Sequence, residues 1–150
     1  MTNKKFVNTK NVENHPDVNY NSVISNIQKD GVCPFCPEQL KKYHKNPILE
    51  ETKSWLVTNN MYPYKNAKHH ILLIHKKHIE NLAEMSQEAW VELNQIFLKA
   101  IERSKIPGGT MFIRFGDTRF TGASVSHLHA HLVSSDPDSP TYGPLLTRVG

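Results

Sequence analysis

Three histidines alternate with aliphatic residues toward the C-terminal end of the chain: His127, His129 and His131 are separated by Leu128 and Ala130. Because side chains two positions apart in a strand project from the same face, this spacing predicts a strand with three imidazoles on one face. Neighbouring imidazoles would start about 6.6 Å apart along the strand, close enough to share one phosphate or one metal ion. Burying three neutral histidines side by side costs desolvation free energy unless something is bound there, so the run predicts a functional site.

The residues just before the histidines are small. Gly122, Ala123 and Ser124 allow a backbone to approach an anion closely, and they offer N–H groups and a hydroxyl as donors. We therefore expect this segment and the histidines to bind a phosphate group together.

The two cysteines of the chain form a second candidate site. Cys33 and Cys36 are separated by Pro34 and Phe35, a spacing typical of metal-binding knuckles, and a closed zinc site needs two further ligands. The same segment could form a redox-active dithiol, but that chemistry requires an aliphatic strand directly before the pair, and Val32 is the only apolar residue close upstream. A third interpretation places a catalytic zinc among the three histidines, where the ion would activate a water molecule.

The composition indicates a globular chain with a modest positive charge. With 150 residues, of which 38% are hydrophobic and 21% charged, the chain fits one compact domain. The net charge of +4 suits an anionic small ligand and gives little support to nucleic-acid binding. No apolar run approaches the ~18 residues of a membrane span, and the first residues lack the apolar centre of a secretory signal. We therefore expect a cytoplasmic protein that acts on a small molecule and does not bind a membrane.

Hydrophobic patterning predicts the elements that position these residues. Residues 1–28 show little periodicity and predict a loose N-terminal arm with a short helical turn near its end, so that one domain spans 29–150. Helical spacing of apolar residues predicts one long helix after the N-cap Ser86. The expected strands are 48–52, 54–58, 68–75, 110–115 and the histidine run, and the expected helix is 86–104. Because strands lie on both sides of one helix without regular alternation, the predicted fold class is α+β with a mostly antiparallel sheet.

Three stretches of the chain together resemble the histidine triad superfamily of nucleotide hydrolases and nucleotidyl transferases. The run 127–133 resembles the family signature of three histidines separated by hydrophobic residues and followed by two more. Residues 62–78 resemble the upstream block, in which one histidine enters an aliphatic strand and a second ends a basic turn. The segment 33–36 resembles a cysteine pair that some branches carry. The resemblance implies a half-barrel of antiparallel strands with the long helix packed on it, usually paired as a homodimer.

The resemblance also implies roles for individual residues. His129 would attack the α-phosphorus of a nucleotide ester, anhydride or phosphoramidate and form a covalent nucleotidyl-histidine, which water then hydrolyses. Imidazole suits this role because its usual pKa near 6.5 leaves much of it unprotonated at neutral pH. His131 would donate to a phosphate or leaving-group oxygen, His70 would lie near the phosphate and the nucleophile, and Ser124 would contact the phosphate or the leaving group. Arg114 stands where many members have Asn, and it is expected to act either as a phosphate donor or as a surface cation.

In members of the superfamily with the cysteine pair, two histidines complete a zinc site. They are the histidine that ends the basic turn and the first of the triad, here His78 and His127. The resemblance therefore implies one structural zinc ion held by Cys33, Cys36, His78 and His127. Transferase branches often have Gln where this chain has His131, so the sequence favours hydrolysis of a dinucleoside polyphosphate or a nucleoside phosphoramidate. The alternatives are a non-catalytic nucleotide-binding module and a metal-dependent hydrolase that uses the three histidines as zinc ligands.

Overall fold

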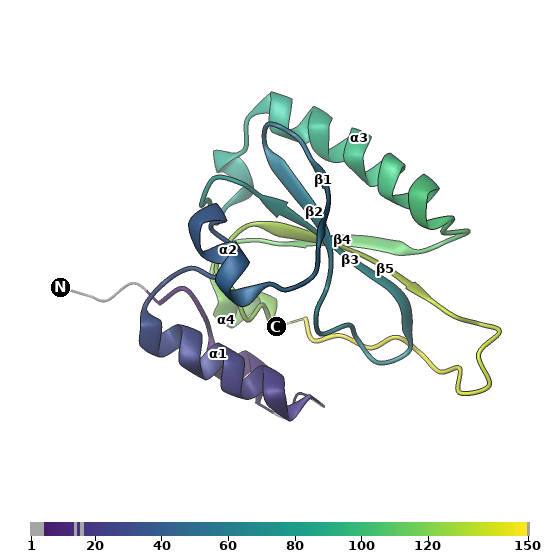
Figure 1. Ribbon diagram of the computed structural model, residues 1–150, viewed down its shortest axis with the longest axis horizontal. Coiled ribbons are helices and arrows are strands. Elements are labelled where there is room, and N and C mark those ends of the chain that lie inside the picture. The colour runs from purple at the N-terminus through teal and green to yellow at the C-terminus, as the bar shows by residue number, and fades with distance from the viewer. Residues whose placement is uncertain (1–4, 14, 16, 150) are drawn as a thin grey trace.

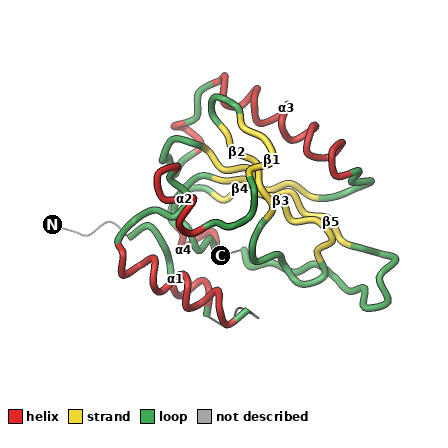
Figure 2. Tube along the Cα trace, viewed as in Figure 1, coloured by secondary structure: helices red, strands yellow, loops and turns green. Residues whose placement is uncertain are grey.

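One antiparallel sheet of five strands organises the molecule, and the computed structural model describes residues 5–13, 15 and 17–149. The strand order is β1-β2-β3-β5-β4, so β1 and β4 form the two edges (Figures 1 and 2). The predicted α+β fold with an antiparallel sheet is confirmed. The strands are β1 (Ile48–Glu51), β2 (Trp55–Asn59), β3 (Ala67–His75), β4 (Thr110–Arg114) and β5 (His129–Ser135), and the helical segments are η1 (Thr9–Val12), α1 (Val18–Asp30), α2 (Pro37–Tyr43), η2 (Leu82–Glu84), α3 (Gln87–Ser104) and α4 (Thr118–Thr121).

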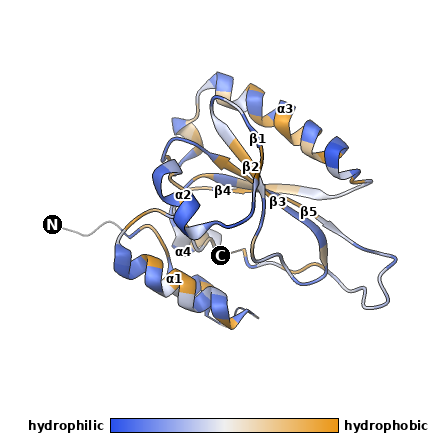
Figure 3. Cartoon of the chain, in the orientation of Figure 1, coloured by the Kyte–Doolittle hydropathy of each residue, from blue (hydrophilic) through white to orange (hydrophobic). Residues whose placement is uncertain are grey.

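The long helix α3 covers one face of the sheet (Figure 1). It begins after Ser86, whose side chain accepts a hydrogen bond from the N–H of Ala89, as the sequence predicts for an N-cap. Figure 3 shows hydrophobic and hydrophilic residues alternating along α3, the pattern of a helix with one buried face. Its buried side packs with Trp55, Leu73 and Leu128 of the sheet and the adjoining loop to form the main core.

The N-terminal segment differs from the loose arm that the sequence pattern predicted, although residues 1–4, 14 and 16 lie outside the described part of the chain. The helix α1 is 13 residues long, is capped by the side chain of Asp17, and ends at Gly31 in the left-handed conformation (φ 66°). Ile24 and Ile27 are buried in a second apolar cluster that includes Val125 of the loop before β5. Only a few apolar residues anchor α1, so its helical pattern is weak in the sequence. The division of the chain into an arm and a domain 29–150 stays a prediction.

The segment after β5 runs without further helix or strand through the described residues to 149, as the sequence predicts for a loop. It returns toward α4, so the C-terminal end lies near the loop that precedes β5 (Figure 1). None of the described helices is long and apolar enough to cross a membrane. The cytoplasmic location inferred from the sequence stays a prediction.

Candidate functional site

The alternating pattern predicted that all three histidines lie in one strand, and the structure shows that this prediction is wrong for the first of them. The strand β5 begins at His129, so His127 belongs to the loop before it. The alternation itself is preserved, because Leu128 and Ala130 are buried in the core under α3 while the imidazoles project from the other side of the sheet. His129 and His131 are neighbours there, with ring centroids 4.9 Å apart, whereas His127 turns its ring toward the cysteines. One histidine run therefore serves two adjacent sites.

His129 is held with one defined nitrogen facing outward. Its Nδ1 lies 2.6 Å from the carbonyl oxygen of His127, which can only accept, so Nδ1 carries the proton and Nε2 has a free lone pair. Burial, with the positive charge of Arg114 acting in the same direction, lowers the pKa of His129 to about 4. The imidazole is therefore neutral near pH 7, as a nitrogen nucleophile must be.

His131 presents an unpaired donor next to this nucleophile. The backbone N–H of Tyr64 donates to Nδ1 of His70 (3.1 Å), so the proton of His70 is on Nε2. This Nε2 lies 2.9 Å from Nδ1 of His131 and donates to it, although the amide nitrogen of Asn60 also approaches the His70 ring. The remaining proton of His131 is consequently on Nε2, an atom that is buried and has no hydrogen-bond partner among the described residues. An unpaired buried N–H is costly, and a phosphate oxygen would satisfy it.

Burial keeps this histidine pair uncharged. The pKa of His70 is lowered to about 4, first by burial and then by the charges of His129 and Arg114. Burial likewise holds the pKa of His131 well below its usual value, with the neighbouring histidines and Arg114 acting in the same direction. Phe112 stacks on the His131 ring at 4.5 Å between centroids and fixes its plane. The pair is therefore a fixed, neutral set of hydrogen-bond donors and acceptors.

The sequence suggested that Arg114 is either a phosphate donor or a surface cation. In the structure, its guanidinium forms several hydrogen bonds with other parts of the chain. Its Nη1 donates to the carbonyls of Thr121 and Arg148, the latter at 2.6 Å, and its Nη2 donates to the hydroxyl of Thr147 at 2.9 Å. The guanidinium also lies 5.1 Å from the centre of the Phe112 ring. It thus joins β4 to the loop before β5 and to the C-terminal segment, while its charge stays at the cavity wall.

A cavity of about 360 Å³ brings these groups together on the face of the sheet opposite α3. Its polar end contains His129, His131, Ser124 and Arg114. Its apolar wall is built largely from the N-terminal part of the chain and includes Val12, Val23, Ile24, Ile27 and Phe35. A space with a phosphate-sized polar end and an apolar wall fits a ligand that joins a phosphate to a flat apolar group.

Several cavity residues could not be found from the sequence. Tyr20 reaches the hydroxyl of Ser124 from 104 positions away, and Tyr64 and Asn60 reach His70 from the loop before β3. Tyrosine and asparagine are common residues, and no spacing in the sequence distinguishes these three. Their positions depend on how the loop and α1 pack against the sheet.

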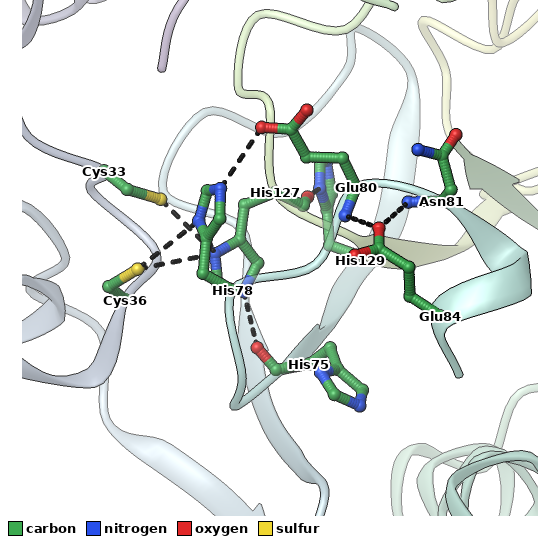
Figure 4. Close-up of polar contacts among 9 residues, drawn as sticks. All are labelled: Cys33, Cys36, His75, His78, Glu80, Asn81, Glu84, His127 and His129. Carbon is green, nitrogen blue, oxygen red and sulfur yellow. Dashed lines mark hydrogen bonds and ion pairs between the residues drawn. The ribbon is translucent and has the colours of Figure 1, made fainter. Parts of the chain in front are cut away.

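Four further side chains converge beside the cavity, as the resemblance implied. The ligand atoms of Cys33, Cys36, His78 and His127 all lie within 4.8 Å of one another (Figure 4). The Nδ1 atoms of the two histidines are 3.2 Å apart, and the sulfur-to-nitrogen distances are 3.3 Å, 3.5 Å and 3.8 Å. Ligands of a tetrahedral zinc ion at about 2.0–2.3 Å from the metal lie about 3.3–3.8 Å from one another, so the four atoms fit that ion.

The protonation of the two histidines also fits a metal. Nε2 of His127 donates to the carbonyl of His75 at 2.5 Å, and Nε2 of His78 donates to a carboxylate oxygen of Glu80 at 3.2 Å (Figure 4). Both Nδ1 atoms therefore point lone pairs into the same small space, an arrangement that a cation stabilises. Burial raises the pKa of the Cys33 thiol to about 12, which disfavours the redox-active dithiol interpretation.

The interpretation with three histidines around a catalytic metal finds no support in this geometry. Both ring nitrogens of His127 already face the cysteine cluster and the backbone of His75. Among the residues that the structure describes, no cluster of potential metal ligands includes His129 or His131.

Comparisons with known proteins show the family of the chain and agree with its fold. The antiparallel α+β sheet, whose inner strand β5 presents His129 and His131 beside a cluster of two cysteines and two histidines, has the fold of solved histidine triad proteins. Within that superfamily, the chain belongs to the family described as "Scavenger mRNA decapping enzyme C-term binding", whose model matches residues 32–144. No curated protein matches the chain.

Solved structures of histidine triad proteins share this fold. A hydrolase of the family from Clostridium thermocellum has 24% identity and a TM-score of 0.57, and the match covers 73% of this chain and 95% of that one. A histidine triad nucleotide-binding protein from Candida albicans has 22% identity and a TM-score of 0.59, covering 78% and 87% of the two chains. A zinc-bound family protein from Mycobacterium smegmatis has 20% identity and a TM-score of 0.56, covering 79% and 82%.

Proposed function

We propose that this chain hydrolyses a phosphate bond of a nucleotide through a covalent nucleotidyl-histidine at His129. The observation that carries the proposal is the pairing of a neutral Nε2 lone pair on His129 with the unpaired Nε2–H of His131 in one cavity. A lone pair for attack and a donor for a phosphate oxygen are the two groups that phosphoryl-type transfer requires. The names of the neighbours from Clostridium thermocellum and Candida albicans, a hydrolase and a nucleotide-binding protein, support the same class.

The proposed reaction has two steps. Nε2 of His129 attacks the α-phosphorus, a P–N bond forms, and the bond from phosphorus to the leaving group breaks with its electron pair. His131 donates to a phosphate oxygen, and Ser124 donates to the phosphate or to the leaving group. Water then attacks the phosphorus, the P–N pair returns to Nε2, one water proton passes to solvent, and a nucleoside monophosphate is released. Because His127 accepts from Nδ1–H of His129, the imidazole stays in the reactive tautomer throughout.

We further propose that Cys33, Cys36, His78 and His127 hold one structural zinc ion. When bound, this ion supplies a cross-link between the N-terminal part of the chain and the loop that leads into β5. The zinc-bound neighbour from Mycobacterium smegmatis supports this proposal. His127 then contributes its backbone carbonyl to the reaction and its side chain to the metal.

The experiment that tests the reaction is nucleotide release, followed by chromatography, from a dinucleoside polyphosphate, an adenosine phosphoramidate and an adenylyl sulfate. We expect His129→Ala to reduce release by at least about a thousandfold because the nucleophile is removed. His69→Ala is a matched control, since His69 lies on β3 but outside the cavity lining, and it should keep wild-type release.

The outcome separates the proposal from the non-catalytic alternative. Release by wild type and by His69→Ala, but not by His129→Ala, supports the covalent mechanism and ranks the leaving groups. A folded wild type that binds AMP and releases nothing from any of the three substrates would instead establish a nucleotide-binding module.

The proposed assembly is a homodimer. Its support is the strand order, which places β4 at an edge of the sheet with Met111 41% exposed. An edge strand has unpaired backbone donors and acceptors, and a second copy of the same strand satisfies them.

A further inference from the structure

The N-terminal segment lies directly on the loop that carries Ser124. The backbone N–H of Asn8 donates to the carbonyl of Ser124 at 2.9 Å, and the N–H of Ser126 donates to the carbonyl of Phe6 at 2.8 Å. The side-chain amide of Asn11 donates to the carbonyl of Ala123 at 2.7 Å. The family model begins at residue 32, so these contacts come from a part of the chain outside the family match. The segment before residue 32 therefore fixes the backbone of the loop next to the nucleophile.

Tyr20 extends this contact to the side chain of the loop. It lies in the first turn of α1, and its hydroxyl is hydrogen-bonded to the hydroxyl of Ser124. The ring of Tyr20 is held between His15 and Tyr62, with centroid separations of 4.7 Å and 4.6 Å. Both residues line the cavity that contains His129. The ring contacts leave the phenol little freedom to turn away from Ser124.

The chemistry of the two hydroxyls sets the direction of this hydrogen bond. A phenol is a stronger acid than an aliphatic alcohol, so Tyr20 is the better donor and Ser124 the better acceptor. Burial raises the pKa of Tyr20 to about 12, which keeps the phenol protonated near neutral pH. An accepting hydroxyl retains its own proton for a second partner and becomes a stronger donor through polarisation.

We propose that Tyr20 is a positioning residue that, by donating to Oγ of Ser124, directs the Ser124 proton toward the leaving-group oxygen of the bond that His129 breaks. This inference rests on the proposed function. As the P–N bond forms, the P–O bond to the leaving group breaks and its electron pair passes to the leaving oxygen. The Ser124 hydroxyl stabilises this oxygen by a hydrogen bond, and no proton leaves Ser124 or Tyr20. The N-terminal helix thereby takes part in setting how basic a leaving group the enzyme can expel.

The basicity of the leaving group provides the test. A p-nitrophenolate ion carries little charge on its oxygen and needs little stabilisation, whereas a phenolate ion is more basic and depends on a donor. We would measure AMP release from the p-nitrophenyl and the phenyl esters of AMP with wild type, Tyr20→Phe and Ser124→Ala. Loss of one directing hydrogen bond is expected to cost about tenfold in kcat/KM for the phenyl ester, and less than about threefold for the p-nitrophenyl ester.

Two controls make the result specific to the Tyr20 hydroxyl. Tyr142→Phe removes the hydroxyl of an exposed tyrosine in the segment after β5 and should match wild type on both esters. In the Ser124→Ala background, adding Tyr20→Phe should cause no further loss, because the group that Tyr20 directs is gone.

The outcomes distinguish this inference from the proposed function. Equal losses of Tyr20→Phe on both esters, or no loss on either, would overturn the positioning role while leaving the His129 mechanism intact. A wild type that releases no AMP from either ester would overturn both. A loss confined to the phenyl ester and absent in the Ser124→Ala background is the result we expect.

Discussion

At the scale of single residues, backbone groups decide which nitrogen of each histidine carries its proton. The carbonyl of His127 fixes His129, and the N–H of Tyr64 fixes His70 and, through it, His131. Main-chain donors and acceptors cannot exchange roles, so the assignment follows from the fold alone. The protein thus holds a lone pair on His129 and an N–H on His131 in two neighbouring rings.

The lowered pKa of His70 predicts a dependence of stability on pH. The folded-state pKa is about 4 and the usual value is 6.5, so between these values the unfolded chain binds a proton that the folded chain does not. The resulting stability is present above pH 6.5 and is lost as the pH falls toward 4, to the extent of about 3 kcal/mol. Wild type should therefore lose about 3 kcal/mol more unfolding free energy than His70→Gln between pH 7 and pH 4.

Urea unfolding at the two pH values measures this difference. His69→Gln is the matched control, because His69 is the neighbouring histidine of β3 and is only half-buried, whereas His70 is buried; it should follow wild type. Parallel losses in wild type and His70→Gln would contradict the assigned burial of a neutral His70.

At the scale of elements, the edge strand β4 has two sides that can form backbone hydrogen bonds with another strand. Within the described residues, only one of these sides is paired. It pairs with β5 from Thr110 to Arg114, and no strand of the described residues pairs with its other side. The side chain of Met111 is 41% exposed at this edge, while Phe112 faces the His131 ring. A second copy paired with this side of β4 would therefore also restrain the strand that packs against the His131 ring.

The homodimer proposal predicts that a charge on β4 separates the copies. Met111→Lys should shift the protein from a mass of two chains to a mass of one, because burying a lysine in an edge-to-edge contact is costly. Sedimentation velocity measures the mass. Ile48→Lys changes a similarly exposed residue on the opposite edge strand β1 and should leave two chains. A wild type that sediments as a single chain would refute the dimer.

At the scale of the whole molecule, the cluster of two cysteines and two histidines connects distant parts of the chain. Cys36 and His78 are 42 positions apart, and Cys33 and His127 are 94 positions apart. Closing such long loops restricts the unfolded chain strongly, so a bound metal is expected to add to the stability of the entire fold.

The zinc proposal predicts one zinc ion per chain by elemental analysis. Cys36→Ser should lose the ion and lower the Tm by about 10 °C or more, since each 1 kcal/mol shifts the Tm by about 2–4 °C in a chain of this size. His44→Gln is the control, because His44 bonds to Thr58 outside the cluster and should retain the ion. A wild type that contains no zinc and has the same Tm as Cys36→Ser would contradict the proposal.

The hydrophobic periodicity of the sequence predicted most of the fold and part of the site. The strands, the helix α3 and the alternation around His129 follow from local patterns, because a buried face imposes a fixed repeat on the sequence. The start of β5 at His129 was missed, because the alternation continues through the preceding loop. The helix α1 was predicted only as a short helical turn, because only Ile24 and Ile27 among its residues are buried.

The sequence by itself determined which groups can react. Two cysteines at knuckle spacing and three alternating histidines restrict the chemistry to imidazole and thiolate ligands, and residue type is a local property. Only the tertiary structure decided how these groups are divided, with His127 facing the cysteines and His129 facing the cavity, and which donors surround them. Tyr20 meets Ser124 across 104 positions, and such a contact depends on packing of α1 against the sheet, which no local repeat encodes.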